Sequence, residues 1–248
     1  MSKDNVPTYR GWEYAEKGDY HRNLDPNWSY TPTYLHKLDF VRKQIQKLGQ
    51  AARILDAGCG EGVLVEEFRH QGFQIEGIDL NYESEIVQRG SVLDLPYRET
   101  SFDAVLLLDV FEHLSYADQV NALSEIRRVL RSEGHFIASI PNLAHWNSRL
   151  RFMLLGKLHR TDCEINHIGE RPFAENKKLL MEAGFWIEKI KGITLTVPFV
   201  YPWIISRRPA RFRWLHDLLE IIAVPSLTLI DVFVCRKKQS DRYESNCA

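Results

Sequence analysis

Three glycines at alternate positions, Gly58, Gly60 and Gly62, follow an apolar run that ends in Asp56. Glycine has no Cβ, so the backbone of such a turn can lie directly against a ligand. A glycine turn between a strand and a helix is typical of sites for nucleotide-containing cofactors, which bind at the helix N-terminus. A dinucleotide fingerprint, G-x-G-x-x-G, would need a glycine where this chain has Val63. The spacing therefore indicates a nucleotide-type cofactor that is not a dinucleotide.

A second acidic residue, Asp79, ends the next apolar run and is followed by Leu80. A carboxylate at the tip of a second strand suits a bidentate contact to ribose hydroxyls. We therefore expect Asp79 and Leu80 to border the cofactor together with the glycine turn. Cys59 lies within that turn, where we interpret it as a small residue tolerated beside the cofactor and not as a catalytic thiol.

Strands and helices are expected to alternate around these residues. Strands are predicted at 53–56, 74–79, 90–92, 102–108, 135–140, 185–190 and 227–235, and helices at 32–48, 63–70, 117–130, 146–155 and 175–183. Gly134 is expected to stop the helix that precedes the fifth strand. The run 102–108 is almost continuously apolar, as in a parallel strand buried on both faces. The alternation predicts an α/β fold with a doubly wound, mostly parallel sheet.

Composition argues against some partners. The 248-residue chain has a formal net charge of −1, which gives no basic footprint for nucleic acid. Residues 214–234 are apolar on average, but charged residues and a proline interrupt them, which argues against a membrane span. The four cysteines have neither CxxC nor zinc-site spacing, and the first residues lack a signal-peptide core. A cytoplasmic location with reduced thiols is expected.

The main domain is assigned to residues 31–238, with one segment before it, one insertion within it and one tail after it. Residues 1–30 are rich in tyrosine and tryptophan and are expected to fold over the domain, either as a lid over the acceptor or by packing alone. Residues 198–225 form an insertion within the domain that combines arginines with aromatic residues, and it could bind an anionic or lipid-linked substrate or make peripheral contact with a membrane. The alternative is that the arginines form a solvated basic face. Residues 239–248 are expected to be a disordered tail.

From Ile54 to about Cys235 the chain resembles the class I S-adenosylmethionine-dependent methyltransferases, in particular the methyltransferase 11/23 type. Besides the glycine turn, the matching stretches are Leu95-Pro96-Tyr97, Ser101-Phe102-Asp103-Ala104-Val105, Glu112-His113-Leu114, Arg128-Val129-Leu130, Gly134 and Ile140-Pro141-Asn142. Residues 141–157 are further similar to the MetW-like branch. The resemblance implies a Rossmann-like sheet of seven strands in three α/β/α layers, with S-adenosylmethionine as the cofactor.

The same resemblance implies roles for individual residues. The three glycines would line the methionine and ribose portions of the cofactor, and Asp79 would hold the ribose hydroxyls. Asp56 would orient the methionine amino group, while Leu108 and Asp109 would border the methionine moiety.

The adenine contact departs from the family pattern. Relatives usually carry an aspartate where this chain has Ser91, and the nearest carboxylate here is Asp94. Adenine recognition by Ser91, by the Val92 backbone or by Asp94 stays open.

Methyl transfer to a hydroxyl requires removal of a proton, and histidine suits this task because its pKa lies near neutral pH. His113, His145 and His167 are the candidate general bases. Each is expected beyond the carboxyl ends of the strands, where ligands bind in open α/β sheets. A general base contributes roughly 10²–10⁴-fold to the rate.

Asp109, Glu112, His113 and His167 also resemble the E-x-x-E-H motif plus distant histidine of methyltransferases that hold a hydroxylated acceptor through a divalent metal. Two carboxylates and two imidazoles could bind Mg²⁺ or Zn²⁺ and leave positions open for substrate oxygens. The alternative is structural: Asp109 caps a turn, while Glu112 and His113 begin a helix.

The first hypothesis for function is O-methylation of a small-molecule, glycan or lipid-linked acceptor. Two alternatives keep the cofactor site. One is a MetW-like accessory protein that assists an acyltransferase in methionine biosynthesis, and the other is a non-catalytic cofactor-binding module. The intact acidic residues and glycines argue against the second. No sequence feature indicates an oligomeric state.

Overall fold

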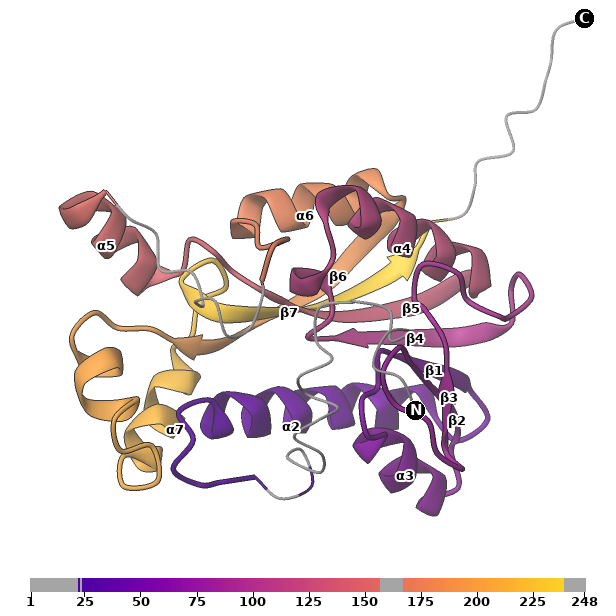
Figure 1. Ribbon diagram of the computed structural model, residues 1–248, viewed down its shortest axis with the longest axis horizontal. Helices are drawn as coiled ribbons and strands as arrows, with labels where there is room; N and C mark the ends of the chain where they lie inside the picture. Colours follow the sequence, from indigo (N-terminus) through magenta and orange to yellow (C-terminus); the bar gives the residue numbers. More distant parts are fainter. Residues whose placement is uncertain (1–21, 23, 157–166, 239–248) are drawn as a thin grey trace, which may run out of the picture.

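The computed structural model describes residue 22 and residues 24–156 and 167–238. Most of the expected lid at 1–30, and the whole expected tail at 239–248, lie outside the described residues. The described chain forms one seven-stranded sheet with helices on both faces (Figure 1). Its strands are β1 (Arg53–Ala57), β2 (Gln74–Asp79), β3 (Val87–Arg89), β4 (Phe102–Leu108), β5 (Leu130–Pro141), β6 (Phe185–Leu195) and β7 (Thr228–Lys237). Its helices are α2 (Thr31–Leu48), α3 (Val63–His70), η2 (Phe111–His113), α4 (Tyr116–Val129), α5 (Trp146–Leu155), α6 (Phe173–Glu182), η3 (Tyr201–Ile205) and α7 (Arg213–Ile221).

The strand order is β3-β2-β1-β4-β5-β7-β6. The pairs from β3 to β5 are parallel, whereas β7 runs antiparallel to both β5 and β6. The order reverses beside β1, so β1 and β4 diverge at the switch point where open α/β sheets bind ligands. This arrangement confirms the predicted α/β fold with a mostly parallel sheet of seven strands.

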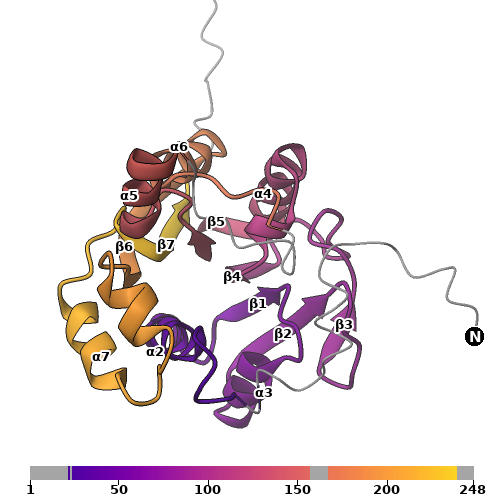
Figure 2. The ribbon, with the colours of Figure 1, turned by 60° about the vertical axis from the view of Figure 1, so that its left-hand side comes forward.

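Helices cover both faces of the sheet (Figure 2), and each face carries its own hydrophobic cluster. On one face, α4 and α6 contribute Leu123 and Leu180 to a cluster that is fully buried at these positions. On the other face, Val41 of α2 and Val65 of α3 are equally buried. Strand β4 is buried between the two layers, as its apolar run predicts.

The third strand differs from the prediction. It covers Val87–Arg89, upstream of the expected residues 90–92, and pairs with the end of β2. At 91–94 the chain turns instead: Ser91 Oγ accepts a hydrogen bond from the Leu93 N–H at 3.1 Å, and Asp94 N–H bonds the Ser91 carbonyl at 3.2 Å. Because serine side chains bond nearby backbone groups, this local turn replaces strand pairing.

Gly134 does not stop a helix, contrary to the prediction. Helix α4 ends at Val129 and β5 begins at Leu130, so Gly134 lies inside the strand. A Cβ at Gly134 would lie 2.9 Å from the Arg131 carbonyl oxygen, so glycine is needed for close packing there. Strand β6 also runs on to Leu195, beyond the predicted end at 190, because its pairing with β7 continues to Thr228.

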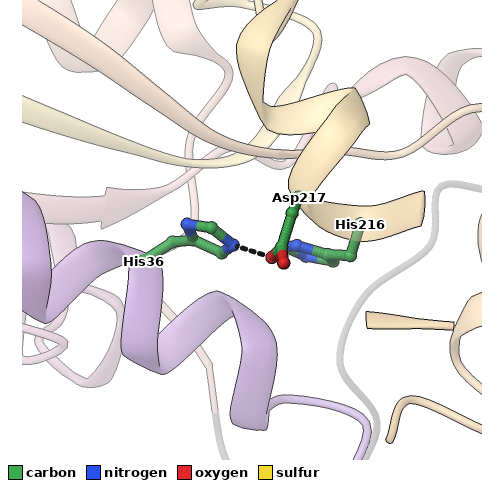
Figure 3. Close-up of side chains that lie close together, drawn as sticks. All are labelled: His36, His216 and Asp217. Carbon is green, nitrogen blue, oxygen red and sulfur yellow. Dashed lines mark hydrogen bonds and ion pairs between the residues drawn. The ribbon is translucent and has the colours of Figure 1, made fainter. Parts of the chain in front are cut away.

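The insertion 198–225 forms η3 and α7, and α7 packs beside α2 (Figure 3). The Nε2 atom of His36 on α2 lies 2.8 Å from Oδ1 of Asp217 on α7. The rings of His36 and His216 stack with centroids 5.1 Å apart. These polar contacts fix the insertion to the domain. Among the described residues, no helix is both long enough and apolar enough to cross a membrane.

Candidate active site

A cavity of about 570 Å³ opens beyond the carboxyl ends of β1, β2 and β4. Most of the predicted cofactor residues line it: Asp56, Gly58, Cys59, Gly60, Asp79, Leu80, Ser91, Val92, Leu108 and Asp109. The residues predicted for acceptor chemistry, Glu112, His113, His145 and His167, line the same cavity. Gly62 and Asp94 are not among the lining residues.

The glycine turn brings the backbone between β1 and α3 to the edge of the cavity. Gly58 has φ of +77°, and a Cβ there would lie 2.3 Å from Cγ2 of Val110. Gly60 N–H donates a hydrogen bond of 2.9 Å to Oδ2 of Asp79. Gly62 instead occupies the left-handed N-cap of α3, where a Cβ would lie 2.7 Å from Cγ2 of Val87. The first two glycines therefore shape the cavity wall, and Gly62 shapes the start of the helix.

Two carboxylates make this end of the cavity acidic. Asp79 is held by its bond from Gly60 and by N–H groups of Asn81 and Tyr82, which donate to Oδ1. Burial raises the pKa of Asp79 despite these hydrogen bonds. Burial and the charge of Asp79 raise the pKa of Asp56 to about 7. Desolvated carboxylates favour a ligand that brings hydroxyl donors or a cationic group.

A buried ion pair also lines the cavity. Lys37 of α2 is only 1% exposed, and its Nζ forms an ion pair with Oδ2 of Asp109. Tyr30 O–H donates to the same oxygen at 2.8 Å, and Ser139 O–H donates to Oδ1 at 2.6 Å. Burial alone would raise the pKa of Asp109, but Lys37 and these hydrogen bonds lower it. Asp109 is therefore ionised, and both of its carboxylate oxygens have partners.

Lys37 was not among the residues predicted from the sequence. It lies on the buried face of α2, between Tyr34 and Leu38, where the helical period predicts an apolar side chain. Its Nζ lies over the rings of Tyr30 and Tyr34, at 5.4 and 5.0 Å from their centroids. A lysine on an apolar helix face was the available signal, because a buried lysine needs a charged partner.

Glu112, His113 and His167 form a cluster that also lines the cavity. One ligand atom from each lies within 4.8 Å of the others, and the two imidazole rings meet edge to face with centroids 5.0 Å apart. Asp109 is not part of this group of possible metal ligands. The expected set of four is thus reduced to three, because Lys37 binds the carboxylate of Asp109.

Protonation at this cluster is set by burial and by neighbouring carboxylates. Burial and the charge of Asp109 raise the pKa of Glu112 to about 8. Nδ1 of His167 lies 2.7 Å from Oε1 of Glu170. Burial alone would lower the pKa of His167, but the bond to Glu170 and the charge of Glu112 raise it. The cluster can therefore hold a proton near neutral pH.

His145 has a different environment from the other two histidines. It is the N-cap of α5, where Nδ1 accepts a hydrogen bond from the Ser148 N–H at 3.4 Å. The same nitrogen lies 2.8 Å from Oγ1 of Thr196, which the sequence did not suggest as a site residue. Thr196 directly follows the last residue of β6, far from His145 along the chain, so no local motif links the two.

Comparison with known proteins relates part of the chain to methyltransferases. Residues 55–138 match the family model described as Methyltransferase domain. A protein of Mycolicibacterium smegmatis named as a probable S-adenosylmethionine-dependent methyltransferase is 32% identical over 56% of this chain and 54% of its own length. A ubiquinone biosynthesis O-methyltransferase of Alkalilimnicola ehrlichii is 32% identical over 43% of this chain and 48% of its own. The chain thus spans about half the length of these curated relatives.

Solved structures share the fold over a longer part of the chain. One from Thermotoga maritima, described as an S-adenosylmethionine-dependent methyltransferase and possible histamine N-methyltransferase, covers 92% of this chain and 100% of its own. The TM-score is 0.58 at 17% identity, so this likeness shows the fold alone. The sequence match lies on the segment that builds β1 to β5, where the glycine turn and both acidic strand ends are found. Residues 55–138 therefore match a methyltransferase domain, within an α/β fold that the solved S-adenosylmethionine-dependent methyltransferase shares.

Proposed function

We propose that this protein transfers a methyl group from S-adenosylmethionine to a hydroxyl of a small-molecule acceptor. The observation that carries the proposal is a single cavity that joins the glycine turn and Asp79 to the cluster of Glu112, His113 and His167. The residues that we propose for the donor and for proton removal therefore share one cavity. The ubiquinone-pathway relatives favour a phenolic acceptor over a glycan. Glycans and lipid-linked sugars stay as further candidates.

The residues at the acidic end fit the cofactor. Gly58 and Gly60 present backbone without a Cβ to the cavity, and Asp79 and Asp56 offer acceptors for hydroxyl and ammonium groups. Ser91 and Val92 line the cavity near β3 and are our candidates for the adenine contact, since Asp94 lies outside the lining. When bound, the cofactor supplies a methyl group on a positively charged sulfur, which is already electrophilic.

The chain's own task is then to exclude water, orient the acceptor and remove its proton. Glu170 is an acceptor when ionised, so the short contact to Nδ1 of His167 indicates that this nitrogen carries the proton. In the neutral ring the lone pair is then on Nε2, which is the atom we propose as the base. His113 is the second candidate, and His145, which caps α5, is the third, with a positioning role favoured by its contacts.

A divalent metal is a second role for the same cluster. The residues fit in part: Glu112, His113 and His167 offer one oxygen and two nitrogen ligands, and Oε2 of Glu112 is buried with no hydrogen-bond partner among the described residues. Nitrogen and oxygen ligands of this kind suit Zn²⁺ better than Mg²⁺, which prefers oxygen. Such an ion would hold a substrate oxygen and favour its deprotonation.

Calorimetric titration with S-adenosylmethionine tests the donor, and a lack of binding would refute the proposal. Release of S-adenosylhomocysteine should then be followed with a panel of catechols, long-chain phenols, amines and sugars. His167→Gln and Glu170→Gln are expected to lower kcat about 10²–10⁴-fold and to remove an ionisation from the pH profile, with cofactor affinity retained. His70→Gln, an exposed histidine on α3, is the matched control.

Two outcomes would redirect the assignment. Transfer to amines but not to hydroxyls would overturn the O-directed proposal. Cofactor binding without turnover, together with stable association with an acyltransferase, would favour the accessory role. For the metal, His113→Ala should lower both bound zinc and activity, whereas lost activity with unchanged metal content would leave only the base role.

A further inference from the structure

Helix α5, the segment 199–204 and helix α7 lie at one end of the molecule in both views (Figures 1 and 2). We call their outward surface the end face. Large apolar side chains are exposed there, and the most exposed are Met153, Leu154, Leu155, Phe199, Trp203, Trp214 and Ile221, at 62–79%. Isolated exposed apolar residues are ordinary, but an accumulation of this size marks an interaction surface.

A helix on a water-exposed surface normally buries its apolar side, but α7 buries polar residues and exposes apolar ones. Its buried residues are His216 and Glu220, both polar. His216 Nε2 lies 3.1 Å from Oγ1 of Thr194, and Oε2 of Glu220 accepts the Thr194 N–H at 2.8 Å. Figure 3 shows the same inner side of α7, where Asp217 reaches His36. Because the polar side of the helix is fixed inward, its apolar side must face outward.

Helix α5 repeats this arrangement. Ser148 is its one buried residue, whereas the run from Phe152 to Leu155 is exposed. In the insertion, the guanidinium of Arg207 lies over the ring of exposed Trp203, with 4.7 Å to its centroid. Tryptophan beside a basic residue is typical of the interface between a bilayer and water.

Charge on the end face has one sign. Five arginines in α5 and the insertion are exposed: Arg149, Arg207, Arg208, Arg211 and Arg213. The two acidic residues of these segments, Asp217 and Glu220, are engaged by His36 and Thr194. Four of the five arginines lie within residues 207–213. A symmetric contact with a second copy would bring these arginines together, whereas anionic lipid would neutralise them.

We propose that the end face binds the surface of a bilayer that contains anionic lipid, with the apolar side chains of α5 and α7 inserted among the headgroups. The binding itself does not depend on the proposed function. Its consequence does: Tyr201 and Ser206 of the insertion, and Asn147 of α5, also line the cavity. A docked protein would therefore hold its cavity beside the membrane, where an acceptor with an apolar tail is found.

Sedimentation with vesicles tests the binding without cofactor or acceptor. The full chain should sediment with vesicles of phosphatidylcholine and phosphatidylglycerol, much less with phosphatidylcholine alone, and less at high salt. Arg207→Gln with Arg208→Gln should weaken binding about fivefold for each arginine, so about 25-fold. Leu218→Glu with Ile221→Glu should weaken it more than about tenfold. Trp186→Glu, at the exposed start of β6, is the control and should bind normally.

Circular dichroism and cofactor titration must first show that each variant is folded. Equal binding to both kinds of vesicle would overturn the charge argument. No binding, together with a dimer in solution that Leu218→Glu and Ile221→Glu dissociate, would assign the end face to a second copy and overturn the proposal. Vesicle binding by a protein that transfers no methyl group would leave the docking intact and refute the proposed function separately.

Discussion

Replacement of Gly58 by alanine tests how closely the glycine turn approaches the segment after β4. At this residue φ is +77°, which costs a side chain about 1–2 kcal/mol. A Cβ there would also lie 2.3 Å from Cγ2 of Val110. Overpacking of this kind costs about 1–3 kcal/mol. Together, the two effects predict a loss of about 2–5 kcal/mol in the free energy of unfolding.

Gly156 provides a matched control at the end of α5. Its φ is +65°, and a Cβ there would meet nothing within 4 Å. Gly156→Ala should therefore lose only the conformational part, about 1–2 kcal/mol. Val110→Ala removes the obstructing methyl groups, so the double-mutant cycle with Gly58→Ala should show about 1–3 kcal/mol of favourable coupling. Urea unfolding followed by circular dichroism measures all four variants.

Two results would refute this reasoning. Equal destabilisation by Gly58→Ala and Gly156→Ala would mean that Val110 does not restrict the turn, and so would a coupling near zero. Calorimetry adds a functional readout. Because Gly58 lines the cavity, the added methyl group should weaken binding of S-adenosylmethionine even in the Gly58→Ala, Val110→Ala protein. Unchanged affinity would contradict the placement of the cofactor against this turn.

Three other substitutions probe the charges. Lys37→Met removes the partner of buried Asp109 and should destabilise the protein by about 3–5 kcal/mol in urea unfolding, with partial recovery on adding Asp109→Asn; a loss below about 1 kcal/mol would contradict a buried pair. Burial raises the pKa of Asp231 to about 7. The contribution of its protonated carboxyl to the free energy of unfolding is therefore fully present below about pH 4 and is lost as the pH rises through 7. Asp231→Asn should therefore stabilise the protein by about 1–4 kcal/mol at pH 8 and have little effect at pH 4, and an equal gain at both pH values would disprove the linkage. Asp79→Ala should weaken S-adenosylmethionine binding about 10–100-fold in calorimetry, and an unchanged Kd would place the ribose elsewhere.

The grouping of the residues proposed for the cofactor around one cavity could be predicted from the sequence, because these residues follow one another along the chain. Asp56 and Asp79 end neighbouring parallel strands, and the carboxyl ends of such strands meet at one edge of the sheet. Their separation along the chain is bridged by a single glycine turn and helix. Boundaries were less predictable: Ser91 bonds the Leu93 N–H, so a local turn displaced the expected third strand to 87–89.

The acceptor end depends on contacts between distant segments. His113 meets His167 only because the chain returns to the same edge of the sheet after β5 and α5. Lys37, the partner of Asp109, comes from α2, which precedes the first strand. No motif near Asp109 indicates that a lysine from α2 will pair with it. Because Asp109 pairs with Lys37, it is not in the group of possible metal ligands. The spacing of residues along the sequence could not predict this.

The sequence by itself determined the alternating α/β pattern, the class of cofactor and the residues at the glycine turn. These depend on local conformation and on the period of apolar residues, which nearby positions encode. The tertiary structure alone decided that Lys37 neutralises Asp109, that three and not four candidate ligands gather, and that α7 turns its polar side inward. Each of these is a contact between segments that only chain folding brings together, and burial then makes an unpaired charge too costly to leave.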